Sequence, residues 1–357
     1  MSLLRSFRFT WLWWVVGPAV AALTVMVITL AVRPVPYYTL SPGSAWSVEP
    51  LVSITSAPDG PDLHDEEVTE DLFFLTVSVR QPFGAEVIWA LTDDRIDVLQ
   101  QDLVDGTQTR EENRRFNRAL MTSAKDKAAK VAIERAGMDV GVSTTGAVVM
   151  DVGPEYPAAE VLTPGDTIVG ADGRSVKSGQ DLVDVIATHE PGEEVALEVE
   201  PLGSTQRHAV KAKLVARPDD GSRPMLGVSL ESRPSYDFPV NVEIDAGDVG
   251  GPSAGLAFAL AILDRLTPGQ LTGGARVAVT GTMELDGTVG RVGGVRQKLE
   301  AAVTAGARMM LVPVEEVAEA SEAADGRIAV RGVATFDEAL DMMVELGGDP
   351  VPAAAAS

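Results

Sequence analysis

The chain has 357 residues, of which 45% are hydrophobic, so it can fold into two or three domains with large cores. Its 52 acidic and 29 basic side chains leave a formal net charge of −23, which repels phosphate backbones and argues against nucleic-acid binding. Cysteine is absent and none of the three histidines lies beyond residue 208. Thiolate chemistry and disulfides are therefore excluded, and neither a metal site nor another cofactor is predicted.

An uncharged apolar run occupies residues 11–32. At about 1.5 Å per residue, a helix of this length spans a hydrocarbon layer of about 30 Å. Arg5 and Arg8 precede the run, so the positive-inside rule predicts a cytoplasmic N-terminus over residues 1–10 and an extracytoplasmic remainder. We therefore predict a single-pass protein of the cell membrane, with a cleaved signal peptide as the alternative.

Residues 33–139 contain one predicted strand and one predicted helix. Leu72 to Val79 is rich in β-branched and aromatic residues and predicts a buried strand. Apolar residues recur every three or four positions from Glu111 to Ala136, which predicts a helix that ends before Gly137.

Short strands and turn signals follow in residues 140–217. Pro-Gly at 164–165 and Asp-Gly at 172–173 flank a predicted strand, and an amphipathic helix is predicted over 178–188. The string PAAEVLTPGDTIVGADG, at 157–173, resembles a signature of bacterial PDZ domains. The resemblance implies a β-rich domain that binds the C-terminus of a peptide as an added strand.

The loop before the first PDZ strand is predicted to hold the carboxylate of that peptide. The predicted binding segment consists of Thr144, Thr145, Gly146, Ala147 and Val148. A clear G-L-G-F-like string is missing there, and a PDZ fold that serves only as a spacer is the alternative.

Strands alternate with helices in residues 223–346, which predicts an α/β domain. The small-residue turn Gly250–Gly255 (GGPSAG) leads directly into an apolar helix over 256–266. Ser253 in this turn is either a helix cap or a nucleophile whose oxyanion the exposed N–H groups and the helix dipole stabilise.

A second predicted helix, over 295–305, places Lys298 on one face with Val295, Leu299 and Ala302. Burial disfavours the charged form of a lysine, and a neutral lysine can take a proton from a serine hydroxyl. The alternative is a lysine whose ammonium group reaches solvent.

The GGPSAG turn and the string TGTMELDGTVGRVGGVRQKLEAA, at 280–302, together resemble the proteolytic domain of Lon proteases. The resemblance implies that Ser253 is the nucleophile, Lys298 the general base and Thr280 a supporting residue. Gly251, Pro252 and Ala254 belong to the same turn. The chain departs from the family where Gly250 replaces an acidic residue and where Thr-Gly-Thr-Met, at 280–283, replaces Thr-Gly-Glu-Ile.

The predicted fold class is α/β (α+β) and multidomain, with an N-terminal transmembrane helix, a PDZ-like domain, a Lon-type proteolytic domain and a disordered tail over 347–357. No G-x-x-x-x-G-K-[ST] string occurs, so proteolysis is predicted to be independent of ATP and directed at unfolded or flexible envelope proteins. The alternatives are a non-catalytic PDZ adaptor and a protein that cleaves only itself. The predicted partners are protein or peptide substrates and the membrane, and the resemblance also implies a ring-shaped homo-oligomer.

Overall fold

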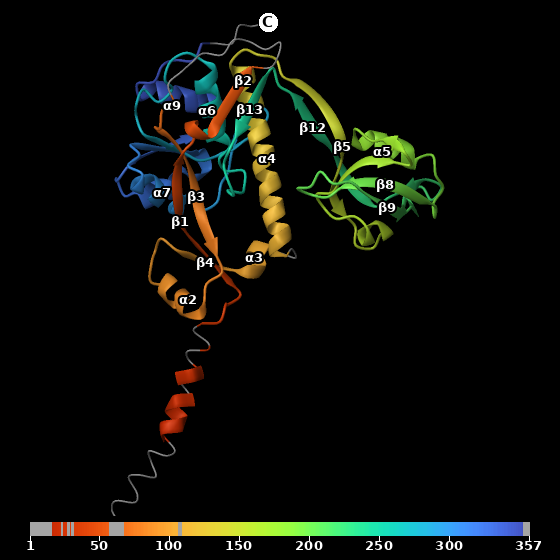
Figure 1. Ribbon diagram of the computed structural model, residues 1–357, viewed down its shortest axis with the longest axis horizontal. Coiled ribbons are helices and arrows are strands. Elements are labelled where there is room, and N and C mark those ends of the chain that lie inside the picture. Colours follow the sequence, from red (N-terminus) through yellow and green to blue (C-terminus); the bar gives the residue numbers. More distant parts are fainter. Residues whose placement is uncertain are drawn as a thin grey trace, which may run out of the picture.

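A six-stranded mixed sheet organises the larger lobe of the computed structural model, which describes residues 16–22, 24–26, 29, 32–56, 68–105 and 109–352 (Figure 1). The strand order is β18-β17-β14-β3-β1-β4. The strands are β1 (Tyr37–Ser47), β3 (Leu72–Arg80), β4 (Asp97–Gln100), β14 (Val277–Val279), β17 (Met309–Pro313) and β18 (Ala329–Val333).

The sheet joins segments that lie far apart in the sequence. β14 pairs in parallel with β3, with Val277 opposite Leu72, and in parallel with β17 on its other side. β1 pairs antiparallel with both β3 and β4. Strands from the predicted 33–139 region and from the predicted 223–346 domain therefore form one sheet.

Helices cover both faces of this sheet. They are α4 (Arg110–Arg135), α6 (Gly255–Leu266), α7 (Val295–Thr304), α8 (Val317–Ala324) and α9 (Phe336–Glu345). Side chains alternate along β3, so Phe74 packs with α4, α6 and α9 while Phe73 packs with α7 and α8. Both cores are apolar, as the runs in the sequence predict.

Helix α4 begins and ends at recognisable signals. Thr109 caps its N-terminus by accepting a hydrogen bond from the Glu112 N–H, and Glu112 bonds back to the Thr109 N–H. Gly137 follows its C-terminus with a φ of +85°. The helix packs against α6 and leads directly into β5 (Gly141–Val152), the first strand of the smaller lobe.

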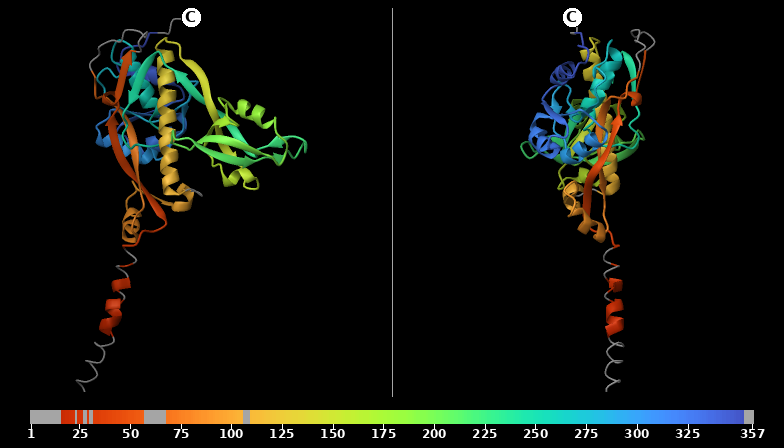
Figure 2. Two further views of the ribbon diagram at one scale, coloured as in Figure 1. Left: turned by 45° about the vertical axis from the view of Figure 1, so that its right-hand side comes forward. Right: turned by 90° about the vertical axis from the view of Figure 1, so that its left-hand side faces the viewer.

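The smaller lobe has its own core and its own sheet, in the order β12-β5-β6-β8-β9 (Figure 2). Its elements are β5, β6 (Thr167–Ala171), β7 (Arg174–Ser175), α5 (Gly179–Ile186), β8 (Glu194–Glu200), β9 (His208–Lys213) and β12 (Val228–Asp237). β5 enters this lobe and β12 returns from it, and the two are paired antiparallel from Gly141–Asp237 to Val152–Val228. The smaller lobe is thus inserted between two parts of the larger one.

Shorter elements complete both lobes. β2 (Val52–Ser56) pairs with β13 (Val240–Ile244) in the larger lobe. The others are η1 (Glu49–Leu51), α2 (Gly84–Ala90), α3 (Gln101–Asp105), η2 (Pro157–Glu160), β10 (Val215–Ala216), β11 (Pro224–Met225), β15 (Thr282–Met283), β16 (Val289–Gly290) and η3 (Val314–Glu316).

The prediction of a single-pass cell-membrane protein is wrong for the described chain. Within the described residues, no helix combines the length and the apolar character that crossing a membrane requires. Residues 11–15, 23, 27, 28, 30 and 31 of the predicted transmembrane helix, and all of the predicted cytoplasmic segment 1–10, lie outside the described residues.

The predicted disordered tail also needs correction. Asp349 donates its N–H to the Gln270 carbonyl and accepts a hydrogen bond from the Gln270 N–H. The Pro352 carbonyl accepts a hydrogen bond from Arg135. Residues 347–352 are therefore bound to the larger lobe, and residues 353–357 lie outside the described residues.

Candidate active site

Ser253 lies in the turn that precedes α6. Gly251 adopts a φ of +89°, which a side chain would strain, and the turn closes with a hydrogen bond from the Gly255 N–H to the Pro252 carbonyl. The Ser253 carbonyl accepts a hydrogen bond from the Gly281 N–H at 3.0 Å. The buried apolar helix α6 therefore anchors the turn from one side and the segment after β14 anchors it from the other.

Lys298 lies on the buried face of α7, as the spacing of its apolar neighbours predicts. Only 2% of the residue is exposed. Its Nζ donates a hydrogen bond to Thr280 Oγ1 at 3.0 Å, and Thr280 Oγ1 donates to the Ser253 carbonyl at 3.2 Å. Thr280 thus connects the amine to the backbone of the serine turn.

Burial lowers the pKa of Lys298 from 10.5 to about 7. The buried carboxylate of Glu316 opposes this shift by favouring the charged amine, but desolvation is the larger effect. A lysine with this pKa is neutral in a substantial fraction of molecules near neutral pH, as a general base requires.

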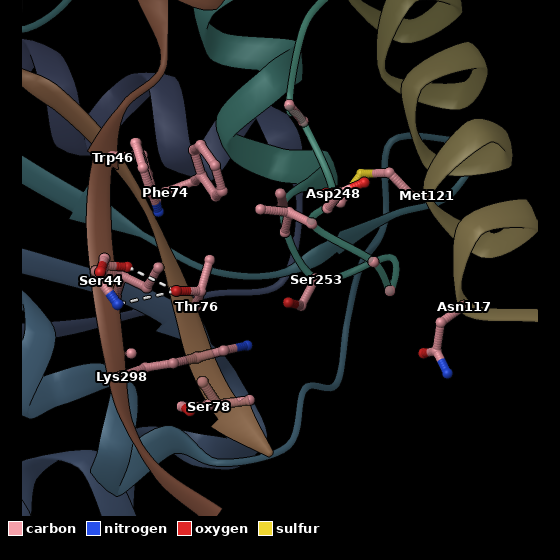
Figure 3. Close-up of a pocket in the computed structure, with 18 of the residues that line it drawn as sticks. Ser44, Trp46, Phe74, Thr76, Ser78, Asn117, Met121, Asp248, Ser253 and Lys298 are labelled. Atoms are coloured by element: carbon pink, nitrogen blue, oxygen red, sulfur yellow. Dashed lines mark hydrogen bonds between the residues drawn. The ribbon is translucent and has the colours of Figure 1, made fainter. Parts of the chain in front are cut away.

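Ser253 and Lys298 line the same cavity, which has a volume of about 950 Å³. Figure 3 shows the serine hydroxyl and the lysine amine directed into the space between them. No hydrogen bond joins these two described side chains. The walls come from β1 and β3, from the loop that leads to Ser253, and from α4, which contributes Asn117 and Met121.

A β-bulge shapes the wall formed by β1. The β1–β3 register shifts between Pro42 and Ala45, and the Thr76 hydroxyl fills the gap by accepting from the Ser44 N–H and donating to the Ser44 carbonyl (Figure 3). The bulge leaves Ser44 and Trp46 as lining residues of the cavity.

The backbone donors of the serine turn are not equivalent. The Gly251 N–H donates to the Asn117 carbonyl at 2.9 Å, and Pro252 has no N–H. The N–H groups of Ser253 and Ala254 donate to no described residue, and both lie at the positive end of α6. Of the predicted turn residues, Gly251 and Pro252 therefore shape the loop, and Ser253 and Ala254 have free donors.

The predicted peptide-binding segment of the smaller lobe, 144–148, lacks an open edge. Ala147 pairs with Ser232 of β12 on one side and with Ile168 of β6 on the other. Val148 is likewise paired on both sides, and Thr144 pairs with Pro234. Thr145 accepts hydrogen bonds from Arg233. The Gly146 N–H donates to the Lys177 carbonyl. A peptide strand cannot add beside this segment, so its placement there is corrected.

One edge strand of this sheet is β12, which lies beside α5. A groove of about 560 Å³ lies there, with apolar residues such as Ile186 and Leu230 and with His189, Arg217 and Arg223 in its lining. Gly227 precedes β12 with a φ of +81°, and a Cβ on it would lie 2.3 Å from Tyr156 Cγ. The string Met-Leu-Gly-Val at 225–228 is the sequence signal for this edge, and it lies after the PDZ-like string, within the predicted 223–346 domain.

Among the described residues, no group of His, Asp and Glu side chains could hold a metal ion.

Two family matches account for most of the chain after residue 135. Residues 136–211 match the PDZ domain, and residues 225–345 match the Lon protease (S16) C-terminal proteolytic domain. The Lon protease of Haemophilus influenzae is 32% identical over 150 residues, which is 40% of this chain and 18% of that protein. These matches support a serine peptidase.

Further similarities are partial. The Lon protease of Xanthomonas oryzae pv. oryzae is 30% identical over 170 residues, 47% of this chain and 20% of that protein. The crystal structure of the PDZ domain of an SdrC-like protein from Listeria monocytogenes shares 32% identity, covers 25% of this chain and 92% of that chain, and has a TM-score of 0.23. The chain therefore spans about a fifth of the length of these Lon proteases.

Proposed function

We propose that the protein is an ATP-independent endopeptidase with a Ser253–Lys298 dyad. The observation that carries the proposal is the buried amine of Lys298, which has a pKa of about 7 and opens into the same cavity as the Ser253 hydroxyl. Thr280 supports it by holding the amine and the serine turn together.

The reaction begins when neutral Lys298 takes the hydroxyl proton of Ser253. Oγ then attacks the peptide carbonyl carbon, and the N–H groups of Ser253 and Ala254 stabilise the resulting oxyanion. The protonated amine of Lys298 gives its proton to the leaving nitrogen as the C–N bond breaks, which leaves an ester on Ser253.

Hydrolysis of this acyl-enzyme uses the same base. Lys298 takes a proton from water, the hydroxide attacks the ester carbonyl, and the second tetrahedral intermediate collapses. The proton returns from Lys298 to Ser253 Oγ as the carboxylic acid product leaves, so the enzyme is restored.

The PDZ domain is proposed to select substrates by their C-termini at the edge strand β12. A strand added there gains backbone hydrogen bonds, and the apolar lining of the groove takes its side chains. A fluorescent peptide with a free C-terminus should bind, and its amidated form should bind more weakly. Substitution Gly227→Val places a side chain against Tyr156. It should weaken binding of the peptide with a free C-terminus more than binding of the amidated peptide.

Unfolded or flexible chains are the proposed substrates, since the 357 residues contain no ATP-binding string of the P-loop type. The test incubates the purified protein with an unfolded reporter protein in the absence of ATP. Ser253→Ala and Lys298→Ala should each abolish cleavage, while the exposed-residue controls Ser321→Ala and Lys213→Ala should retain it.

The outcomes separate the proposal from its alternatives. Cleavage of the reporter that depends on Ser253 supports a peptidase acting on other proteins. Cleavage of the chain alone supports a self-cleaving protein, and loss of both activities supports a PDZ adaptor. Full cleavage by the Lys298→Ala variant excludes the dyad.

A further inference from the structure

The charged residues of the catalytic cavity are two carboxylates and one amine. Asp245 and Asp248 line the cavity together with Lys298. Lys298 is uncharged when it acts as a base, so the remaining fixed charge of the cavity is negative. A substrate side chain of positive charge is therefore favoured near the scissile bond, and one of negative charge is repelled.

The two carboxylates differ in what they contact. Asp245 Oδ1 accepts a hydrogen bond from the Gly247 N–H at 3.1 Å. The side chain of Asp248 has no hydrogen bond or ion pair with any described residue, and it is exposed at the cavity wall. It is the carboxylate that is free to pair with a substrate.

The loop that carries Asp248 is held at both ends. The Asp245 N–H donates to the Leu51 carbonyl at 3.0 Å, and the Gly251 N–H donates to the Asn117 carbonyl at 2.9 Å. Between them, the Val249 N–H donates to the Ala246 carbonyl at 3.3 Å. Asp248 is therefore fixed on the same loop as Ser253, five residues before it.

The opposite wall carries aromatic side chains as well as the hydroxyl groups of Ser44 and Thr76. Figure 3 shows Trp46 and Phe74 across the cavity from Asp248 and Met121, with Ser253 lying between the two sides. Trp46 is 51% exposed, so its ring is available to a ligand. An aliphatic stem can lie along this wall while its cationic head extends toward the carboxylate on the other side.

We infer that Asp248 is a specificity-determining residue that selects peptide bonds with a lysine or arginine side chain next to them. The inference rests on the proposed function, because it names the substrate class of the same site. Lysine and arginine combine an apolar stem with a positive head, which matches the Trp46 wall and the Asp248 carboxylate. Because Asp248 is exposed, the preference should be moderate, roughly two- to fivefold in kcat/KM, and should fall as salt is added.

The test uses peptides that differ at one position only, scanned over three residues on each side of the scissile bond. Each position carries lysine, glutamate or norleucine, which has the stem of lysine without its amine. The measured quantity is the ratio of kcat/KM for lysine to that for norleucine. Wild type should show a ratio above one at one or more of these positions.

Two substitutions at Asp248 then test whether its negative charge causes the preference. Asp248→Asn should bring the ratio at that position close to one, and Asp248→Lys should favour glutamate over lysine. Glu243→Gln is the matched control: Glu243 is exposed, lies five residues before Asp248 and does not line the cavity, so its ratio should stay at the wild-type value.

A lysine preference that persists unchanged in Asp248→Asn and Asp248→Lys would overturn the inference while leaving the peptidase intact. Absence of a lysine preference in wild type would overturn it as well. Failure of the proposed function has a different signature, because cleavage of every peptide would then be absent or would persist in Ser253→Ala.

Discussion

Dependence on pH is the sharpest consequence of burying Lys298. With the ordinary pKa of 10.5, the amine would be neutral in roughly 3 of 10⁴ molecules at pH 7, and with a pKa of about 7 it is neutral in about half. Burial therefore increases the amount of active base by about 10³-fold at this pH. The value of kcat/KM for a peptide with no titrating side chain should rise tenfold per pH unit below pH 7 and level off above it.

A second variant tests the cause of this profile. Glu316 favours the protonated amine, so Glu316→Gln should lower the pKa of Lys298 further and move the rising limb of the profile to lower pH. Glu316 is 3% exposed, and its Oε1 accepts a hydrogen bond from Arg291, which glutamine can also accept. The neighbouring exposed residue Glu315 provides the control, and Glu315→Gln should leave the profile in place.

The assay is the initial rate of cleavage of one fluorogenic peptide from pH 5 to pH 10 at constant ionic strength. A midpoint near 10.5, or a rate without a rising limb, would refute the assignment of Lys298 as the titrating base. If the rising limb of the pH profile stays at the same pH in Glu316→Gln, the effect of Glu316 on the pKa of Lys298 is refuted. The assignment of Lys298 as the base is not affected by that result.

Two further predictions concern the residues around the amine. Thr280→Val removes the hydrogen-bond partner of Lys298 in a buried site, and it should lower kcat by roughly 10- to 100-fold with little change in KM, as measured with the same peptide. Lys298→Met should raise the free energy of unfolding by up to about 4 kcal/mol at pH 7, measured by urea denaturation. The unfolded state binds the extra proton between pH 7 and 10.5, so the wild type gains stability as pH rises through this window and the advantage of Lys298→Met should shrink. An advantage that grows with pH would contradict this account.

Local signals in the sequence predict most of the catalytic elements. The apolar run before Leu266 gives α6, and the spacing around Lys298 gives its place on the buried face of α7. These elements follow from periodicity and turn chemistry within about 15 residues, which the sequence displays directly.

Other parts of the cavity depend on contacts between distant segments. Trp46, Asn117 and Met121 reach the cavity only because β1, β3 and α4 pack against elements that follow the PDZ domain. Pairing of Val277 with Leu72 joins positions about 200 residues apart, and no local periodicity specifies such a partner. For the same reason the sequence does not predict the PDZ groove, because β12 completes a sheet whose other strands precede it in sequence.

Insertion of the PDZ domain between two parts of the catalytic fold leads to a last prediction about fragments. Residues 223–357 contain Ser253 and Lys298 but lack β1, β3 and α4, so the edge of β14 is unpaired and the cavity loses a wall. This fragment should therefore lack peptidase activity and cooperative unfolding. Replacing residues 141–237 by a short Gly-Ser turn should preserve peptidase activity and cooperative unfolding. Gly141 and Asp237 are paired, so the two chain ends that the turn must join are adjacent. Wild-type cleavage by the 223–357 fragment would show that the N-terminal strands are dispensable, whereas activity only in the chain without the PDZ domain would show that the shared sheet builds the site.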